Sequence, residues 1–312
     1  MQTLRNFLIA FVVGLLLFGF AAINLPRHLG LGKYAGRDTG SDRRVQTQDI
    51  PVSDTTSQTE TVERSENGYT MLIGGYDEAG ELNMLLVASA DRAGERFMLS
   101  SLPTALRVRV PDETGEPSLV RLAAMPWRFD GADCRAKIVE TVEGITGLPI
   151  DYYIFFDKDA ALGLFELTGG LYFDVPCEMN AADGETGDDA DFSLSAGGQV
   201  LGKKRIIGLL DYDDYGLGGT ADSVRRAETQ VDFVDQALLQ IMKLERSTLN
   251  RIAAMVLPTC DTNLSYEDYE FYAPLLEKYA DWHGSLARVI PEAHDPIEEA
   301  ETIALFAPYR DE

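Results

Sequence analysis

The sequence predicts an α/β protein, an α/β/α sandwich with a central mixed sheet that is preceded by one N-terminal transmembrane helix. Two observations predict this arrangement. Short β-rich segments alternate with helical segments from about residue 68 onward, as in sheets covered by helices on both faces. Before them, residues 7–23 form an uncharged apolar stretch, which approaches the roughly 20 residues that cross a bilayer when it is counted to Leu25.

Three regions follow from this pattern. Residues 1–25 are expected to be a transmembrane anchor with a short cytoplasmic end, and residues 26–67 a flexible extracytoplasmic stalk, since they are polar and poor in large apolar side chains. Residues 68–312 are expected to form one extracytoplasmic domain, so that the protein is a single-pass protein of the cell membrane. A cleaved signal peptide stays an alternative, because Gly19 and Ala21 suit a signal peptidase, but the length of the segment favours a signal anchor.

The charge balance excludes nucleic acid as a partner. The chain has 51 acidic and 27 basic residues and a formal net charge of −24. Binding to nucleic acid needs clustered cations, and the short basic run at residues 203–205 is interpreted as a solvated helix face. Cys134, Cys177 and Cys260 are too few and too widely spaced for a disulfide framework, and their pairing stays open, as does the oligomeric state.

The elements are predicted from hydrophobic periodicity and from Gly and Pro turns. The predicted strands cover residues 69–73, 84–88, 96–99, 106–110, 152–156 and 171–175. The predicted helices cover residues 132–146, 160–167, 203–210, 223–244 and 266–279. The acidic stretch at residues 178–191 is expected to be a solvated loop, and the glycine-rich residues 216–219 a turn rather than a phosphate cradle, because the surrounding motif is absent.

One central block is specific enough to suggest a family. Residues 147–157 read GLPIDYYIFFD and residues 164–176 read LFELTGGLYFDVP. This block resembles that of the LytR-CpsA-Psr (LCP) family, which reads approximately GIPIDYY, then a helix, then LGGVxVDVP. MLIGG at residues 71–75, SLP at residues 101–103 and the Asp222-x-x-Arg225 motif fall in the family's order around it. The resemblance covers nearly all of the chain after residue 68.

The resemblance implies a chemistry and a set of partners. LCP proteins transfer a glycopolymer from a polyprenyl-pyrophosphate carrier to peptidoglycan outside the membrane. Arginines and a divalent cation would spread the charge of the pyrophosphate, and carboxylates would hold that cation. The implied cofactor is Mg²⁺ if the protein is active, and none otherwise. The implied partners are the cell membrane, reached through the N-terminal helix, polyprenyl-linked glycopolymer and peptidoglycan.

This sequence departs from the family at the charged positions. The family's RSDT element reads GELN at residues 80–83, and its SIPRD element reads SLPTA at residues 101–105. The R-x-R pair is replaced by Asp211 and Asp213, and the second arginine of the last motif by Glu228. Carboxylates in place of arginines repel pyrophosphate. The sequence therefore predicts a catalytically weakened or inactive relative, a possible pseudoenzyme that acts in cell-wall biogenesis by binding or regulation. The alternative is an active phosphotransferase.

The sequence assigns no catalytic residue, but it does indicate candidate residues for ligand binding. The candidates for pyrophosphate binding are Arg225, Arg226, Arg107 and Arg121. The supporting or metal candidates are Asp77, Asp222 and Gln230, of which Asp77 is the candidate metal ligand. Arg225 has a structural alternative of equal weight, an ion pair with Asp222 or Glu228 on the same helix. The histidines at positions 28, 283 and 294 show no metal-ligand spacing and are interpreted as structural or surface residues.

Overall fold

The computed structural model describes residues 64–111, 115–129, 131–180, 192–292 and 294–309. The predicted anchor, and the predicted stalk apart from residues 64–67, lie outside these residues. Among the described helices, none is both long enough and apolar enough to cross a bilayer.

The core of the described region is a mixed sheet. Its strands, in spatial order, are β11 (Asp261–Thr262), β6 (Tyr152–Phe156), β1 (Gly68–Tyr76), β2 (Leu82–Asp91), β3 (Arg96–Ser101) and β12 (Ala287–Val289). β2 runs antiparallel to both β1 and β3, whereas β6 pairs parallel with β1 and β12 parallel with β3. The prediction of a mixed central sheet is confirmed.

Alternation of side chains along β2 gives the sheet two buried faces. Leu85 and Val87 point into one hydrophobic cluster, and Leu86 points into another on the opposite face. The first face is covered by α3 (Gly131–Thr146), α10 (Glu299–Phe306) and the hairpin of β4 (Arg107–Pro111) and β5 (Pro117–Arg121). The second is covered by α6 (Thr220–Ile241), α8 (Tyr266–Leu276) and α9 (Tyr279–Trp282). Helices on both faces make the predicted three-layer arrangement.

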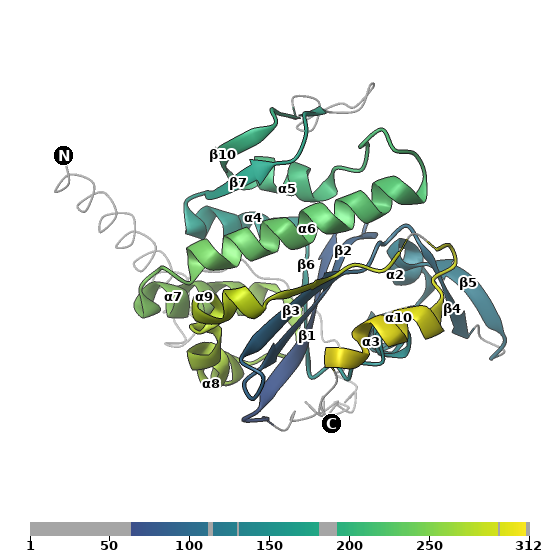
Figure 1. The fold of residues 1–312 in the computed structure, drawn as a ribbon, viewed down its shortest axis with the longest axis horizontal. Coiled ribbons are helices and arrows are strands. Elements are labelled where there is room, and N and C mark those ends of the chain that lie inside the picture. Colours follow the sequence, from purple (N-terminus) through teal and green to yellow (C-terminus); the bar gives the residue numbers. More distant parts are fainter. Residues whose placement is uncertain (1–63, 112–114, 130, 181–191, 293, 310–312) are drawn as a thin grey trace, which may run out of the picture. The chain divides into compact units, whose positions relative to one another are not determined.

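α6 connects this sheet to a smaller layer (Figure 1). The smaller layer consists of the antiparallel pair β7 (Leu171–Val175) and β10 (Gly197–Leu201), the short pair β8 (Met179–Asn180) and β9 (Ser193–Leu194), α4 (Lys158–Thr168) and α5 (Lys203–Asp211). Val231 on α6 packs toward the central sheet, whereas Phe233 packs edge-to-face on Phe165 and Phe173. Burial on both sides makes α6 the element that holds the two layers together.

The helices with clear periodicity lie where the sequence predicts them, within a few residues. The predicted helix at 266–279 ends earlier, at Leu276, and a separate turn, α9, follows. Several short elements were not predicted: β5, β8, β9, β10, β11, β12, α2 (Met125–Arg128), α7 (Arg246–Val256) and α10. The expectation of a solvated loop at residues 178–191 is wrong at Met179–Asn180, where β8 pairs with β9 and Met179 is buried. The basic run at residues 203–205 begins α5, and Lys204 and Arg205 are exposed, as expected for a solvated helix face.

A buried carboxylate joins α6 to α9 and β12. Asp235 is 1% exposed. Its Oδ1 accepts a hydrogen bond from the Tyr279 hydroxyl at 2.8 Å and lies 2.9 Å from His283 Nε2, and its Oδ2 accepts one from Arg288. The hydrogen bond to Asp235 raises the pKa of the Arg288 guanidinium. A buried charge is tolerated when it is paired and hydrogen-bonded in this way.

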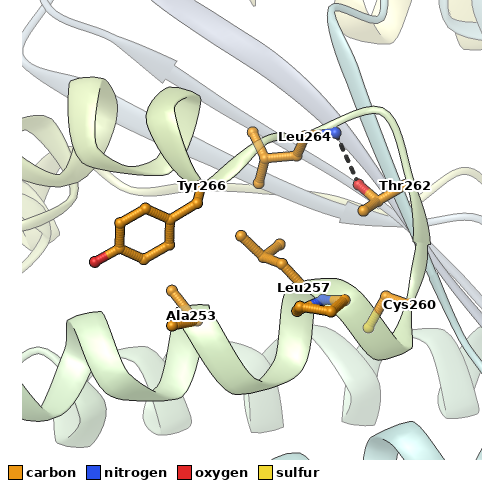
Figure 2. Close-up of a pocket in the computed structure, with 8 residues that line it drawn as sticks. Ala253, Leu257, Cys260, Thr262, Leu264 and Tyr266 are labelled. Atoms are coloured by element: carbon orange, nitrogen blue, oxygen red, sulfur yellow. Dashed lines mark hydrogen bonds between the residues drawn. The ribbon is translucent and has the colours of Figure 1, made fainter. Parts of the chain in front are cut away.

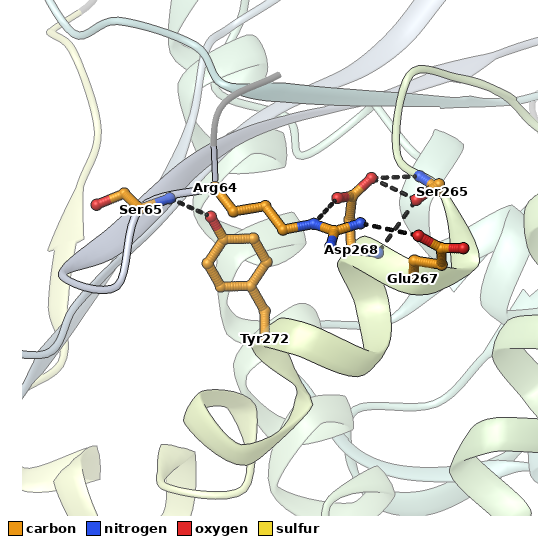
Figure 3. Close-up of polar contacts among 6 residues, drawn as sticks. All are labelled: Arg64, Ser65, Ser265, Glu267, Asp268 and Tyr272. Carbon is orange, nitrogen blue, oxygen red and sulfur yellow. Dashed lines mark hydrogen bonds and ion pairs between the residues drawn. The ribbon is translucent and has the colours of Figure 1, made fainter. Parts of the chain in front are cut away.

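Just before β1, Arg64 and Ser65 are held against α8 by contacts with Asp268 and Tyr272, which we call the clasp (Figure 3). Arg64 Nε donates to Asp268 Oδ1 at 2.5 Å, and the Ser65 amide donates to the Tyr272 hydroxyl at 3.1 Å. Asp268 also closes the capping box of α8 with Ser265. The last residues of the predicted stalk thus contact the domain.

The clasp makes a pH-dependent contribution to stability. Burial by itself raises the pKa of Asp268, but the hydrogen bonds from Ser265 and Arg64 outweigh it and hold the pKa below its ordinary value of 3.8. Because the folded-state pKa is lowered, this contribution is complete above about pH 4 and is lost as the pH falls through the folded-state pKa. Asp268→Asn should therefore destabilise the protein most near neutral pH, and the difference from wild type in urea unfolding should shrink toward pH 3.

A matched control is available in the same turn. Glu267 is 83% exposed and meets Arg64 at 3.4 Å, so Glu267→Gln should change stability little at any pH. A difference between wild type and Asp268→Asn that stays constant from pH 7 to pH 3 would contradict the expected titration.

Candidate functional site

The candidate site is a hydrogen-bond network at the end of the central sheet where β2 begins and β3 ends. Gln230 of α6 lies at its centre and is 2% exposed. Its Nε2 donates to the backbone oxygens of Asn83 at 3.0 Å and Leu210 at 2.9 Å, and its Oε1 accepts from Ser101 Oγ at 2.8 Å. Asn83 Nδ2 donates to the carboxylate of Asp211. One glutamine thus connects β2, β3, α5 and α6.

Arg226 is the candidate arginine that enters this network. Its Nη2 donates to the Asn83 backbone oxygen at 2.6 Å, and its Nη1 lies 4.0 Å from Asp213 Oδ2. The side chain is 16% exposed, and its buried Nε has no hydrogen-bond partner among the described residues. Burying an N–H without a partner costs free energy, so this atom is the one unmet donor of the network in the described part of the chain.

Arg225, by contrast, forms an ion pair with a residue of its own helix. Its Nη1 pairs with Glu228 Oε2 at 2.7 Å, and this hydrogen bond raises the pKa of the Arg225 guanidinium. The pair spans one helical turn, and both side chains are about two-fifths exposed, at 39% and 43%. The sequence left open whether Arg225 binds phosphate or forms an ion pair on its own helix. The structure contains the ion pair, with Glu228 as the partner.

Asp222 organises the loop before α6. Its carboxylate accepts backbone N–H groups from Tyr215 at 3.1 Å, Leu217 at 3.0 Å and Gly218 at 2.7 Å. Gly218 has a φ of 84°, which favours glycine, so the loop is a tight turn held by one carboxylate. The interpretation of residues 216–219 as a turn is confirmed, and Asp222 contributes structure there.

Asp77, the candidate metal ligand, has a structural role in this fold. Its Oδ1 accepts the Glu81 amide at 2.8 Å, which closes the turn between β1 and β2. A Mg²⁺ site needs several oxygen donors around one point. Within the described ranges, no group of three or more acidic, cysteine or histidine side chains is arranged to hold a cation. The Asp77 carboxylate therefore has a structural role, because it closes this turn.

Arg107 and Arg121 lie on the β4–β5 hairpin, where they face each other across the strands. Arg107 pairs with Asp295, with distances of 3.1 and 3.3 Å from Nε to the two carboxylate oxygens. Neither arginine makes a hydrogen bond to the Gln230 network that is seen in the described residues. The structure thus brings Arg226 and Gln230 together and places Arg107 and Arg121 elsewhere.

Two network members were not singled out from the sequence. Asn83 ends the element that replaces the family's RSDT, and Ser101 begins the one that replaces SIPRD. Their positions within the two family motifs could have indicated that they belong to the site, but the prediction considered only the charged residues that these motifs lack. Around the network, Arg225 and Arg226 are outnumbered by the carboxylates of Asp211, Asp213 and Glu228, so the local charge is negative.

A separate pocket of about 460 Å³ lies between the end of α7 and the start of α8 (Figure 2). Ala253, Leu257, Cys260, Leu264 and Tyr266 line it. Burial raises the pKa of the Cys260 thiol to about 11, which disfavours the reactive thiolate at neutral pH. The lining carries no arginine or carboxylate, so this pocket does not suit pyrophosphate.

Comparison with solved structures identifies the architecture. The LytR-Csp2A-Psr enzyme from Actinomyces oris matches with a TM-score of 0.61 over 78% of this chain and 90% of that chain, at 17% sequence identity. The described domain has the LytR-CpsA-Psr fold. TagV from Bacillus subtilis shares this LCP fold at a TM-score of 0.59 and 18% identity, over 73% of this chain and 86% of that one. The resemblance predicted from the sequence is confirmed at the level of the fold.

Two further observations bear on the LCP relatives. TagT bound to LIIa-WTA matches with a TM-score of 0.57 at 14% identity, over 80% of this chain and 93% of that chain. By sequence, the chain is 27% identical over 128 residues to TagV of Bacillus subtilis, a polyisoprenyl-teichoic acid–peptidoglycan teichoic acid transferase. The match covers 39% of this chain and 31% of TagV, about a third of that protein's length. No family model matches the chain.

Proposed function

We propose that this chain is a membrane-anchored, extracytoplasmic LCP-like protein of the cell envelope that acts in glycopolymer assembly by binding or regulation, with weak or absent transferase activity. The LCP fold and the partial match to a teichoic acid transferase support the biological setting. The apolar segment at residues 7–23 supports the anchor. The anchor would bring the domain within reach of lipid-linked partners.

The observation that carries the proposal is that both arginines of α6 are already occupied. Arg225 is neutralised by Glu228, and Arg226 is held by the Asn83 backbone and Asp213. Asp211 and Asp213 stand where the resemblance places the family's R-x-R pair. A site of this charge offers little stabilisation to a departing pyrophosphate, because transition-state stabilisation there depends on preorganised cations.

One observation favours the alternative of an active phosphotransferase. Arg226 Nε is buried without a partner among the described residues, and the oxygen of an anionic ligand would satisfy it. Under this alternative, Arg226 would bind a phosphate oxygen directly, and the neighbouring carboxylates would have to be displaced or protonated.

Restoring positive charge should restore pyrophosphate binding. In the double variant Asp213→Arg/Glu228→Arg, we expect the affinity for a short polyprenyl pyrophosphate to rise by about tenfold or more, since two repulsive charges become attractive. Both side chains are substantially exposed, at 75% and 43%, so the variant should fold. Isothermal titration of the full chain in detergent measures the affinity, with and without Mg²⁺.

Arg226→Gln distinguishes the two functions in the same assay. If the protein is a weakened relative, wild type binds the pyrophosphate poorly and Arg226→Gln changes little. Micromolar binding by wild type that Arg226→Gln abolishes would contradict a site that repels pyrophosphate and would support the transferase alternative instead. A matched control is Arg251→Gln on α7, an exposed arginine outside the network, which should bind as wild type does.

A further inference from the structure

The antiparallel pair of β7 and β10 in the smaller layer has two edges, of which the β7 edge is closed by α6. The Oε1 atom of Gln240 accepts a hydrogen bond from the Tyr172 amide at 2.7 Å, and its Nε2 donates to the Tyr172 backbone oxygen at 2.7 Å. A side-chain amide thus takes the place of a neighbouring strand on this edge. Figure 1 shows β10 at the outer margin of the smaller layer, with β7 between it and α6.

The bonds of Gln240 also fix which backbone groups β10 exposes. The N–H and C=O of one strand residue point the same way, so those of Tyr172 point away from β10, and its pair with Val200 is not hydrogen-bonded. Such pairs alternate along an antiparallel ladder, so the pair of Asp174 with Gly198 is of the same kind. The N–H and C=O groups of Gly198 and Val200 therefore point outward, away from β7.

These outward groups form an unpaired strand edge. Among the described residues, no side chain or loop amide bonds to them. Gly198 and Val200 are exposed, Val200 at 65%. An exposed edge is a template for pairing with another strand, and proteins commonly protect it with lysine or proline. The sequence of β10, GGQVL, contains neither.

The side chains beside this edge are apolar. Val200 lies opposite Tyr172, which is 50% exposed on the same outer face of the pair. A Cβ added to Gly198 would collide with the Tyr172 hydroxyl, so the tyrosine side chain reaches diagonally across the pair and covers Gly198. The outer face therefore presents a tyrosine ring and a valine next to an open edge.

The edge of β10 is complementary to a second copy of itself. When two β10 strands run antiparallel about a two-fold axis at Gln199, Gly198 of each copy lies opposite Val200 of the other. Because the groups of both residues point outward, both of these pairs can exchange N–H···O bonds. Each valine then stands beside a glycine that has no side chain to clash with it, and against the Tyr172 ring. An interface of this kind satisfies the two-fold symmetry that homodimers require.

The charges near the edge permit this pairing, although the chain has a net charge of −24. β10 itself is uncharged, and Asp174 is the acidic residue on the outer face of the pair. In a joined sheet the two Asp174 positions would be three strand spacings apart, about 14 Å, which exceeds the Debye length of about 8 Å. A single carboxylate offers little to a basic peptide, so the neutral strand of a second copy fits this edge better.

We propose that β10 is a dimerisation edge, at which two copies of this chain join their β7–β10 pairs into one continuous sheet. The contact consists of two short strands and the Tyr172 and Val200 side chains of both copies. This is less than the roughly 1,200 Å² of a stable interface, so the dimer is weak, with a Kd on the order of 100 µM. α5 begins at Lys203, just after β10, and ends at Asp211 of the Gln230 network, so the contact lies one helix away from each candidate site.

Val200→Pro tests the edge while leaving the β7–β10 ladder intact. The Val200 N–H points to solvent in a single copy, so proline removes a donor of the dimer and none of the ladder. The matched control is Val200→Thr, which keeps the N–H and the branched shape. Sedimentation equilibrium of the full chain in detergent should give a Kd about tenfold higher or more for Val200→Pro, and one within about threefold of wild type for Val200→Thr. All three chains share the same N-terminal segment, so a difference between them reports on the edge.

Gln199→Cys tests the register of the pairing. At the two-fold axis the two substituted positions face each other with Cα atoms about 4.5 Å apart, which suits a disulfide. Mild oxidation should therefore cross-link Gln199→Cys, with wild type and its own cysteines as the background. Ser195→Cys, which would lie opposite position 203 of the other copy, should not cross-link.

Three outcomes would overturn the proposal. They are a wild-type chain that stays monomeric up to about 1 mM, equal dimerisation of wild type and Val200→Pro, and cross-linking of Ser195→Cys as readily as of Gln199→Cys. Urea unfolding of Val200→Pro at low concentration confirms that the variant is folded. The pyrophosphate titration does not depend on this contact, so its result bears on the proposed function alone.

Discussion

Replacing Asp235 by asparagine is expected to lower the free energy of unfolding by about 3 kcal/mol. The substitution keeps the shape but removes the charge that accepts hydrogen bonds from Tyr279 and Arg288 and faces His283. Breaking a fully buried pair costs about 3–5 kcal/mol, and we expect the low end because Arg288 is 48% exposed and can recover solvation. Urea unfolding followed by tryptophan fluorescence measures the loss.

Asp232 provides the matched control on the same helix. It is half-exposed, lies 3.8 Å from Arg288 Nε, and its pKa is raised, chiefly by burial. Because its ionised form is already disfavoured, Asp232→Asn should cost less than about 1 kcal/mol. Equal losses in the two variants would show that Asp235 has no special role in joining α6 to α9 and β12.

Gln230→Met is expected to cost a similar amount, about 3 kcal/mol. Methionine keeps the length of the side chain but leaves the Ser101 hydroxyl and two backbone oxygens without their partner. Each abandoned buried group costs about 1–3 kcal/mol, and entry of water into the site reduces the sum. The same urea unfolding assay measures the loss of stability.

Gln240→Met, ten residues further along α6, is the control. Its amide also bonds to a strand, through the Tyr172 backbone, but at an exposed position. Water can replace those bonds, so the cost should be about 1 kcal/mol or less. If the two variants lost equal stability, the burial of Gln230 would not be what makes the network important.

The sequence predicted those parts of the fold whose pattern is local. The strands β1 and β6 contain runs of apolar and aromatic residues, and the helices α3 and α6 have apolar periodicity over several turns, so their positions were predicted within a few residues. β11 and β12 have two and three residues, which is too short for any period, and they exist only because a neighbouring strand offers them hydrogen bonds. α7 and α10 lie in the last part of the chain, where the sequence predicts only the helix at residues 266–279.

The site was predictable only where its contacts are local. The pair of Arg225 and Glu228 spans three residues, and the sequence offered it as one of two alternatives. The contact between Asn83 and Asp211 joins residues that are 128 positions apart, and no spacing rule reaches that far. Metal binding at Asp77 and the activity of the site stay predictions, although the hydrogen bond of Asp77 in its turn already accounts for that carboxylate.

The clasp of Arg64 on α8 also has a mechanical consequence. A pulling force that reaches the domain through the residues before Arg64 meets the ion pair with Asp268 and the bond from Ser65 to Tyr272 before it reaches β1. β1 is hydrogen-bonded on both sides, to β2 and β6, and lies at the centre of the sheet. Tension would therefore first break the contacts of Arg64 and Ser65 with α8. β1 and the candidate site at its far end would keep their structure.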